Sequence, residues 1–134
     1  MQLAHINPAE TKAWQQLTTH AADMKQQTMR QLFAQDADRF KKFSLCTEDL
    51  VFDYSKNLIT EETMQLLLQL AEACKLEEAI AAMMDGELIN ATENRAVLHT
   101  ALRNMSNNPV ITQGADVMPE VRRVLAQMEA FCQK

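Results

Sequence analysis

The sequence predicts a mainly α-helical fold with one or two short strands. Apolar residues recur at helical spacing across 13–24, 60–84 and 117–132. Only one short run, 50–54, combines β-branched and aromatic residues in the manner of a strand. The chain has 134 residues, of which 47% are apolar, and this is enough for one domain with one hydrophobic core.

The first helix is expected to begin at Asn7, which can cap it. Pro8 suits the first helical position, and Glu10 can reach back as in a capping box. Its apolar face is predicted to contain Ala13, Trp14, Leu17, Ala21 and Met24. We expect His20, near the helix end, to be a surface residue or one that stabilises the helix dipole, and not a ligand.

Residues 28–43 predict two short helical turns separated by a break rich in aspartate. Three phenylalanines in this stretch are interpreted as anchors onto another layer: Phe33, Phe40 and Phe43. The basic cluster Arg39, Lys41 and Lys42 lies beside Asp36 and Asp38, so we interpret it as a solvated loop or helix end.

The strand at 50–54 needs a partner for its backbone hydrogen bonds. The candidates are weak and lie at 88–89 and 110–112. Tyr54, Ser55 and Lys56 follow the strand, but their spacing matches neither the Tyr-x-x-x-Lys nor the Ser-x-x-Lys arrangement, and we expect a structural role for them.

Thr60 is a predicted N-cap, followed by Glu61 and Glu62 where the helix dipole favours carboxylates. The apolar stripe of this helix is predicted to contain Met64, Leu67, Leu68 and Ala71, widened by Leu66, Leu70 and Ala73. So broad a stripe indicates a helix that is covered on more than one side. A further helix at 76–84 is expected to place Ile80, Met83 and Met84 inward and to end at Gly86.

Polar groups are densest between Asn90 and Pro109. We predict a turn-rich hub here, against which the flanking helices pack. The reason is that the guanidinium of arginine can donate hydrogen bonds to several carbonyls of an irregular backbone at once. If the segment is helical, Arg95 and Arg103 flank His99 at four residues on either side and would favour a neutral imidazole able to act as a base. We prefer a scaffolding role for all three.

The last helix is predicted to be capped by Asp116, with Pro119 in its first turn. Its apolar stripe is Val117, Val121, Val124, Leu125, Met128 and Phe131 or Cys132. The pattern continues to residue 134 without a glycine or proline, so we expect this chain to be a piece of a longer protein.

Composition excludes several classes of function. Gly86 and Gly114 lie too far apart to form a phosphate-binding glycine loop, and the net charge of −5 argues against nucleic acid as a partner. Neither a membrane span nor a signal peptide is predicted. His5, His20 and His99 have no partners at metal-ligand spacing, so no metal site is predicted.

Three cysteines, Cys46, Cys74 and Cys132, are an odd and widely spaced set. We expect reduced, buried thiols in a cytoplasmic protein.

Four motifs together resemble the N-terminal part of the glucose-6-phosphate isomerase (phosphoglucose isomerase) family. They are D-Y-S-K-N at 53–57, I-T-E-E-T at 59–63, the hub sequence at 90–109, and D-V-M-P-E-V at 116–121. The similarity begins at N-P-A-E-T near the start and keeps the order and spacing of the family. The family's proteins are several times longer than this chain.

The resemblance implies that 1–134 is the N-terminal helical segment of an α/β enzyme of the sugar-isomerase (SIS) type. Such enzymes interconvert glucose 6-phosphate and fructose 6-phosphate through a cis-enediol, without metal or nucleotide cofactor, and are typically dimeric. Their catalytic motifs lie downstream of the part matched here, so we assign no catalytic, substrate-binding or metal residue to this chain. The expected partners are the remainder of the enzyme chain and a second subunit. The alternative is a free-standing helical module that binds another protein.

Overall fold

The structure, a computed structural model, describes residues 3–106 and 108–133. It contains two compact units, Ile6–Cys74 and the described residues of Met1–His5 and Lys75–Lys134. No helix in the described ranges is both long and apolar enough to cross a membrane. Helices dominate both units, as predicted, but the described strands form two small antiparallel pairs where one or two strands were expected.

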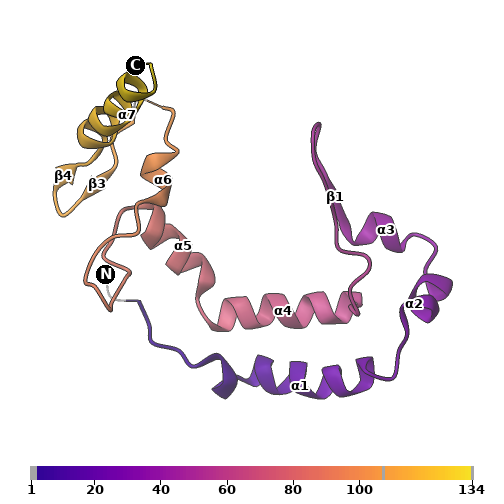
Figure 1. The fold of residues 1–134 in the computed structure, drawn as a ribbon. Coiled ribbons are helices and arrows are strands. Elements are labelled where there is room, and N and C mark those ends of the chain that lie inside the picture. The colour runs from indigo at the N-terminus through magenta and orange to yellow at the C-terminus, as the bar shows by residue number, and fades with distance from the viewer. Residues whose placement is uncertain (1–2, 107, 134) are drawn as a thin grey trace. The chain divides into compact units, whose positions relative to one another are not determined.

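The first unit is built on two helices that lie side by side in opposite directions, α1 (Lys12–Met24) and α4 (Glu61–Ala73) (Figure 1). Asn7 caps the chain as predicted, but it caps the short 3-10 turn η1 (Pro8–Glu10). The α-helix itself begins after Thr11, whose hydroxyl accepts a hydrogen bond from the backbone N–H of Trp14. Thr60 caps α4, which confirms that prediction.

The faces that α1 and α4 bury differ from the predicted stripes. Ala13 and Met24 of α1 are buried, whereas Trp14 is 45% exposed. On α4 the buried residues are Thr63 and Leu66, and the predicted inward residues Leu67 and Leu68 are 42% and 66% exposed. The helix is rotated relative to the prediction because Thr63, a polar residue, faces α1 and forms a hydrogen bond with it.

Two short helices, α2 (Met29–Gln35) and α3 (Arg39–Lys42), follow α1 and are separated at Asp36–Asp38, as the sequence predicts. A capping box between Thr28 and Gln31 starts α2. Of the three predicted phenylalanine anchors only Phe43 is buried; Phe33 and Phe40 remain 38% and 47% exposed.

The predicted strand pairs with a segment that the sequence analysis missed. β2 (Val51–Asp53) forms an antiparallel hairpin with β1 (Ser44–Cys46), and not with 88–89 or 110–112. A tight turn closes the hairpin, with the backbone N–H of Thr47 donating to the carbonyl of Leu50 at 2.8 Å. The missed strand contains Ser-Leu-Cys, which has no β-branched residue, so its composition gave little signal.

The second unit contains α5 (Leu76–Met84), α6 (His99–Leu102) and α7 (Met118–Cys132), with a two-stranded pair formed by β3 (Ile111–Thr112) and β4 (Ala115–Asp116). The predicted bounds of α5 and its end at Gly86 are confirmed. The buried apolar side chains among its described residues are Ala82, Ala101 and Met118. The expected inward positions of α5 are wrong for Ile80 and Met84, which are 48% and 59% exposed.

The prediction that Asp116 caps α7 is wrong by one residue, because Val117 occupies the N-cap position and makes no side-chain cap hydrogen bond. The carboxylate of Asp116, just before it, accepts a hydrogen bond from the backbone N–H of Met118 at 3.0 Å. The apolar stripe of α7, in contrast, is mostly uncovered. Its exposed members are Val124, Leu125, Met128 and Phe131.

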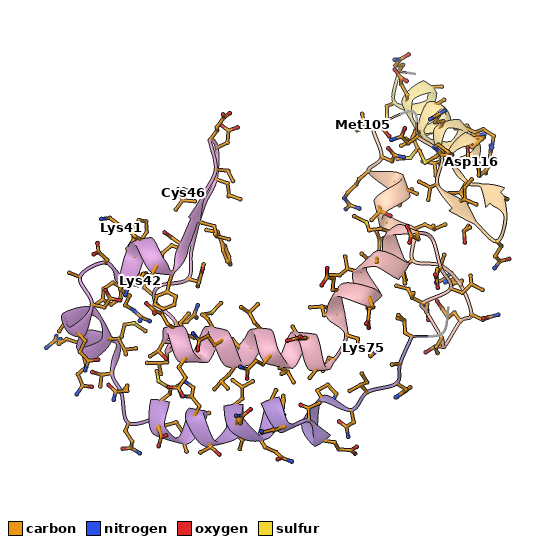
Figure 2. The ribbon with its side chains drawn as sticks, turned by 180° about the vertical axis from the view of Figure 1, so that it is seen from behind. Lys41, Lys42, Cys46, Lys75, Met105 and Asp116 are labelled. Atoms are coloured by element: carbon orange, nitrogen blue, oxygen red, sulfur yellow. The ribbon has the colours of Figure 1, made fainter. Side chains whose placement is uncertain are left out.

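The three cysteines are free, but the expectation that they are buried is wrong. Cys46 and Cys132 are exposed, and Cys74 is partly buried. Cys46 lies on β1 (Figure 2).

Candidate functional site

The three hub residues singled out by the sequence do not converge on one reactive centre. His99 is the first residue of α6, and Arg103 donates from Nη1 to its backbone carbonyl at 3.2 Å. Arg95 forms an ion pair with Glu93. Within the described residues neither arginine forms a hydrogen bond to the imidazole of His99.

The polar side chains of the hub mainly hold a turn in shape. Asn90 and Arg95 form an isolated antiparallel bridge. The amide of Asn90 donates to the Glu93 carboxylate at 2.8 Å and accepts from the Glu93 backbone N–H. Asn94 adopts a left-handed backbone with φ of 51°, which asparagine tolerates better than most residues. The turn-rich character predicted for this segment is therefore confirmed at 90–95.

A groove of about 750 Å³ runs along the hub within the second unit. Its walls are mainly apolar and come from the hub, β4 and the start of α7: Ala96, Val97, Leu98, Leu102, Ala115, Val117 and Val121. Arg95 and His99 also line it. An apolar surface of this kind suits packing against other side chains better than it suits acid–base chemistry.

The arginine whose guanidinium binds carbonyls of an irregular backbone segment is Arg39, in the first unit. Arg39 is 2% exposed, so the interpretation of its cluster as a solvated helix end is wrong for this residue, whereas the side chain of Lys41 is 81% exposed, as that interpretation predicts. Its Nε donates to the carbonyl of Ser55 and its Nη2 to the carbonyl of Asn57, both at 2.8 Å. The guanidinium also lies over the rings of Phe33 and Phe43, at 5.5 and 4.8 Å from their centroids.

Lys42 is the second member of that basic cluster with a structural role. Its ammonium bridges Asp36 at 3.0 Å and Glu61 at 2.8 Å, and so connects the break before α3 to the first turn of α4. The hydrogen bond from Lys42 lowers the pKa of Asp36, while the two carboxylates, Glu61 first, raise the pKa of Lys42.

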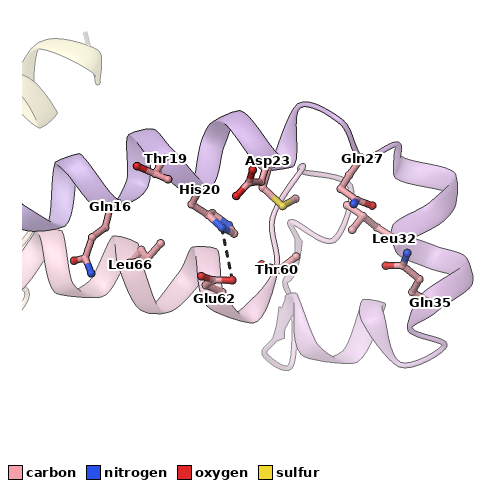
Figure 3. Close-up of a pocket in the computed structure, with 11 residues that line it drawn as sticks. Gln16, Thr19, His20, Asp23, Gln27, Leu32, Gln35, Thr60, Glu62 and Leu66 are labelled. Atoms are coloured by element: carbon pink, nitrogen blue, oxygen red, sulfur yellow. Dashed lines mark ion pairs between the residues drawn. The ribbon is translucent and has the colours of Figure 1, made fainter.

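His20 joins α1 to α4 and is not the surface residue that was expected. Its Nε2 lies 2.7 Å from the hydroxyl oxygen of Thr63, and its Nδ1 lies 3.7 Å from the carboxylate of Glu62. The side chain of His20 is only 11% exposed. It borders an open pocket of about 510 Å³ with mixed polar and apolar walls, between α1, α2 and the start of α4 (Figure 3).

His20 is part of the cap of α4. The Thr63 hydroxyl oxygen also accepts from the backbone N–H of Thr60 at 2.9 Å, and the Thr60 hydroxyl oxygen accepts from the N–H of Thr63. The imidazole therefore reaches a hydroxyl that is already fixed by a capping box, which fits a joint between helices. No three histidine, cysteine or carboxylate side chains within 3–106 and 108–133 are grouped so that they could hold a metal ion.

The sequence model of the phosphoglucose isomerase family matches residues 53–134. This chain belongs to the phosphoglucose isomerase family. The match includes four of the motifs that carried the resemblance, while the N-P-A-E-T sequence at 7–11 lies outside it.

The phosphoglucose isomerase motifs lie on structural joints in this chain. D-Y-S-K-N supplies the two carbonyls that Arg39 binds, and I-T-E-E-T supplies the cap of α4. The hub motif forms the 90–95 turn and α6, and D-V-M-P-E-V starts α7. The roles seen for these family motifs are caps, turns and backbone clamps.

Proposed function

We propose that this chain is the N-terminal structural segment of a glucose-6-phosphate isomerase. The complete enzyme would interconvert glucose 6-phosphate and fructose 6-phosphate in the cytoplasm, with the sugar phosphate bound by downstream sugar-isomerase domains. The segment itself would have no isomerase activity. The observation that carries this proposal is the family match over 53–134, combined with motifs that serve as structural joints.

The uncovered apolar faces support a scaffolding role. Leu68 of α4, Met84 of α5 and Phe131 of α7 are 66%, 59% and 79% exposed. Apolar surface on this scale marks sites where other protein packs. We propose that the remainder of the enzyme covers these faces, and that the enzyme is a homodimer.

The first test is an isomerase assay on the 134-residue chain with fructose 6-phosphate, coupled to oxidation of the glucose 6-phosphate formed. We expect no turnover above the blank, while a full-length family enzyme serves as the positive control. Turnover comparable with that control would contradict the proposal and place an active site within these residues.

The second test asks whether the chain binds the remainder of a family enzyme. We expect the two pieces to copurify after coexpression, and Leu68→Glu to weaken that association at least about tenfold because it places a charge on a covered apolar face. Gln65→Glu, at another exposed position of α4, is the matched control. A chain that neither copurifies nor binds a hydrophobic dye would favour the free-standing interaction module.

A further inference from the structure

The turn that ends α5 joins an aspartate to a glycine, and it is the one Asp-Gly pair in the sequence. Asp85 is the C-cap residue of α5 and is exposed, whereas Gly86 is buried. In such a pair the backbone nitrogen of the glycine can attack the side-chain carboxyl carbon of the aspartate, because glycine has no Cβ to shield its nitrogen. The turn therefore contains both partners of a backbone rearrangement.

This rearrangement would convert Asp85 to isoaspartate. A bond forms between the nitrogen of Gly86 and Cγ of the Asp85 carboxylic acid, and the proton of the nitrogen leaves with the acid hydroxyl as water. The product is a five-membered succinimide ring. A water molecule that then attacks the former backbone carbonyl of Asp85 breaks its bond to the nitrogen, and the main chain continues through Cβ and Cγ. Water is the one co-reactant, and nothing is oxidised or reduced.

The folded backbone holds the reacting atoms apart. Ring closure requires the nitrogen of Gly86 to be eclipsed with Cβ of Asp85 about the Cα–C bond. The ψ of Asp85 is 0°, which eclipses that nitrogen with the backbone nitrogen of Asp85 itself. At a tetrahedral Cα the correct position for Cβ is roughly a third of a turn away. The peptide between the two residues must therefore rotate before the ring can form.

Hydrogen bonds at the end of α5 oppose this rotation. The backbone N–H of Gly86 donates to the carbonyl of Met83 at 3.3 Å, and that of Glu87 donates to the carbonyl of Ala82 at 3.0 Å. These two bonds form a Schellman motif, with Gly86 at its left-handed position. Turning the peptide before Gly86 would break the first bond and displace the second.

Strand β3 holds Gly86 from outside the helix. The carbonyl of Gly86 accepts a hydrogen bond from the hydroxyl of Thr112 at 2.7 Å. A Cβ at Gly86 would lie 2.5 Å from the carbonyl oxygen of Ile111, so the two backbones are in close contact. The contact with β3 therefore restrains the same peptide whose rotation the reaction requires.

We propose that Asp85 is a site of spontaneous isomerisation to isoaspartate, which the contact of Gly86 with β3 suppresses while the second unit is folded. Asp85 lines an open pocket of about 570 Å³, so water reaches it. The rearranged chain has one additional methylene in its backbone, which would displace Gly86 from β3. Isomerisation would therefore mark chains in which this joint has opened. This inference goes beyond the proposed function and does not depend on it.

The first test compares the folded 134-residue chain with the same chain in guanidinium chloride, at one pH and temperature. Trypsin releases the peptide 76–95, in which isoaspartate keeps the mass of aspartate but is separated by chromatography and located by electron-transfer fragmentation. Deamidation of Asn90 or Asn94 changes the mass and is not confused with it. We expect isoaspartate at position 85 to form at least about tenfold faster in the unfolded chain. Equal rates would overturn the protection, and no isoaspartate in the unfolded chain would overturn the site.

The second test asks whether β3 provides the protection. Thr112→Val removes the hydroxyl that binds the carbonyl of Gly86, and we expect the folded chain to isomerise about threefold faster or more. Thr112→Ser is the matched control, because it keeps the hydroxyl and should leave the rate near that of the unsubstituted chain. Circular dichroism confirms that each variant is folded. Equal rates in the two folded variants would overturn the role of β3, and the comparison of folded with unfolded chain requires neither variant.

Discussion

The guanidinium of Arg39 donates from Nε to the backbone carbonyl of Ser55 at 2.8 Å. Ser55 is 1% exposed and Arg39 is 2% exposed, so this hydrogen bond connects two buried groups sixteen residues apart. The side chain of Ser55 does not take part, because its hydroxyl donates to the carboxylate of Asp53 at 2.6 Å. The contact therefore fixes the path of the backbone after β2.

Replacing Arg39 with alanine should destabilise the first unit by about 3 kcal/mol. The substitution leaves the carbonyls of Ser55 and Asn57 without their donor, and a buried group that loses its partner costs about 1–3 kcal/mol. Urea unfolding followed by circular dichroism measures the change. Arg39→Lys should show an intermediate loss, because one ammonium cannot reproduce the planar fork. A loss no larger than that of the exposed control Arg30→Ala would contradict the role assigned to Arg39.

Removing the hydroxyl of Thr63 should weaken both the cap of α4 and the contact of α4 with α1. Thr63→Val keeps the side-chain shape but loses the partner of His20 and the acceptor for the Thr60 N–H, and we expect a cost of about 1–2 kcal/mol. Thr18→Val is the control, because that exposed hydroxyl bonds only within its own helix, to the carbonyl of Trp14. Equal thermal stability of the two variants would contradict a stabilising role for the two hydrogen bonds of the Thr63 hydroxyl.

Glycine substitutions in the second unit should show the effect of one close backbone contact. Gly86 and Gly114 both have positive φ, 72° and 79°, so alanine is strained at each by about 1–2 kcal/mol. A Cβ at Gly86 would lie 2.5 Å from the carbonyl oxygen of Ile111, whereas at Gly114 it would meet nothing within 4 Å.

Gly86→Ala should therefore cost about 1–3 kcal/mol more than Gly114→Ala. Hydrogen exchange measured by mass spectrometry should show the loss as faster exchange in peptides covering 82–90 and 110–118. Similar protection in the two variants would mean that the contact between Gly86 and Ile111 is relaxed at little cost.

Acid should weaken the ionic connection between α3 and α4. The hydrogen bond from Lys42 lowers the pKa of Asp36 below its ordinary 3.8. The stabilisation that this carboxylate provides is therefore complete above about pH 4, and it is lost as the pH falls through the lower pKa of the folded state. We expect the stability of Asp36→Asn to fall less between pH 5 and pH 2 than that of the unsubstituted chain. An identical decline would contradict the assignment, and Asp49→Asn is the exposed control.

Local signals predicted the helices well. The caps at Asn7 and Thr60, the end of α5 at Gly86 and the break between α2 and α3 depend on residues close in sequence. The buried faces of the helices were predicted less well, because the buried face of a helix depends on which element packs against it. Leu67 and Leu68 are as apolar as Leu66, and only the contact with α1 distinguishes them.

The clamp at Arg39 could not be predicted for a different reason. Arginine beside two lysines and two aspartates is typical of a solvated surface, and its acceptors are carbonyls, which are present at every residue. Two nearby phenylalanines, Phe33 and Phe43, were the one signal available, since aromatic rings accommodate a buried guanidinium. For His99 the preferred scaffolding role is still a prediction, because hydrogen bonds around it do not test catalysis.

The clamp also has a consequence for how this chain can be shortened. The carbonyls of Ser55 and Asn57 lie within the stretch that matches the family, but the arginine that holds them lies before it, at position 39. A peptide trimmed to begin at residue 53 would keep every matched residue and lose the donor. The boundary of sequence similarity is therefore not an autonomous folding boundary, and any excision here should retain the chain from before α1.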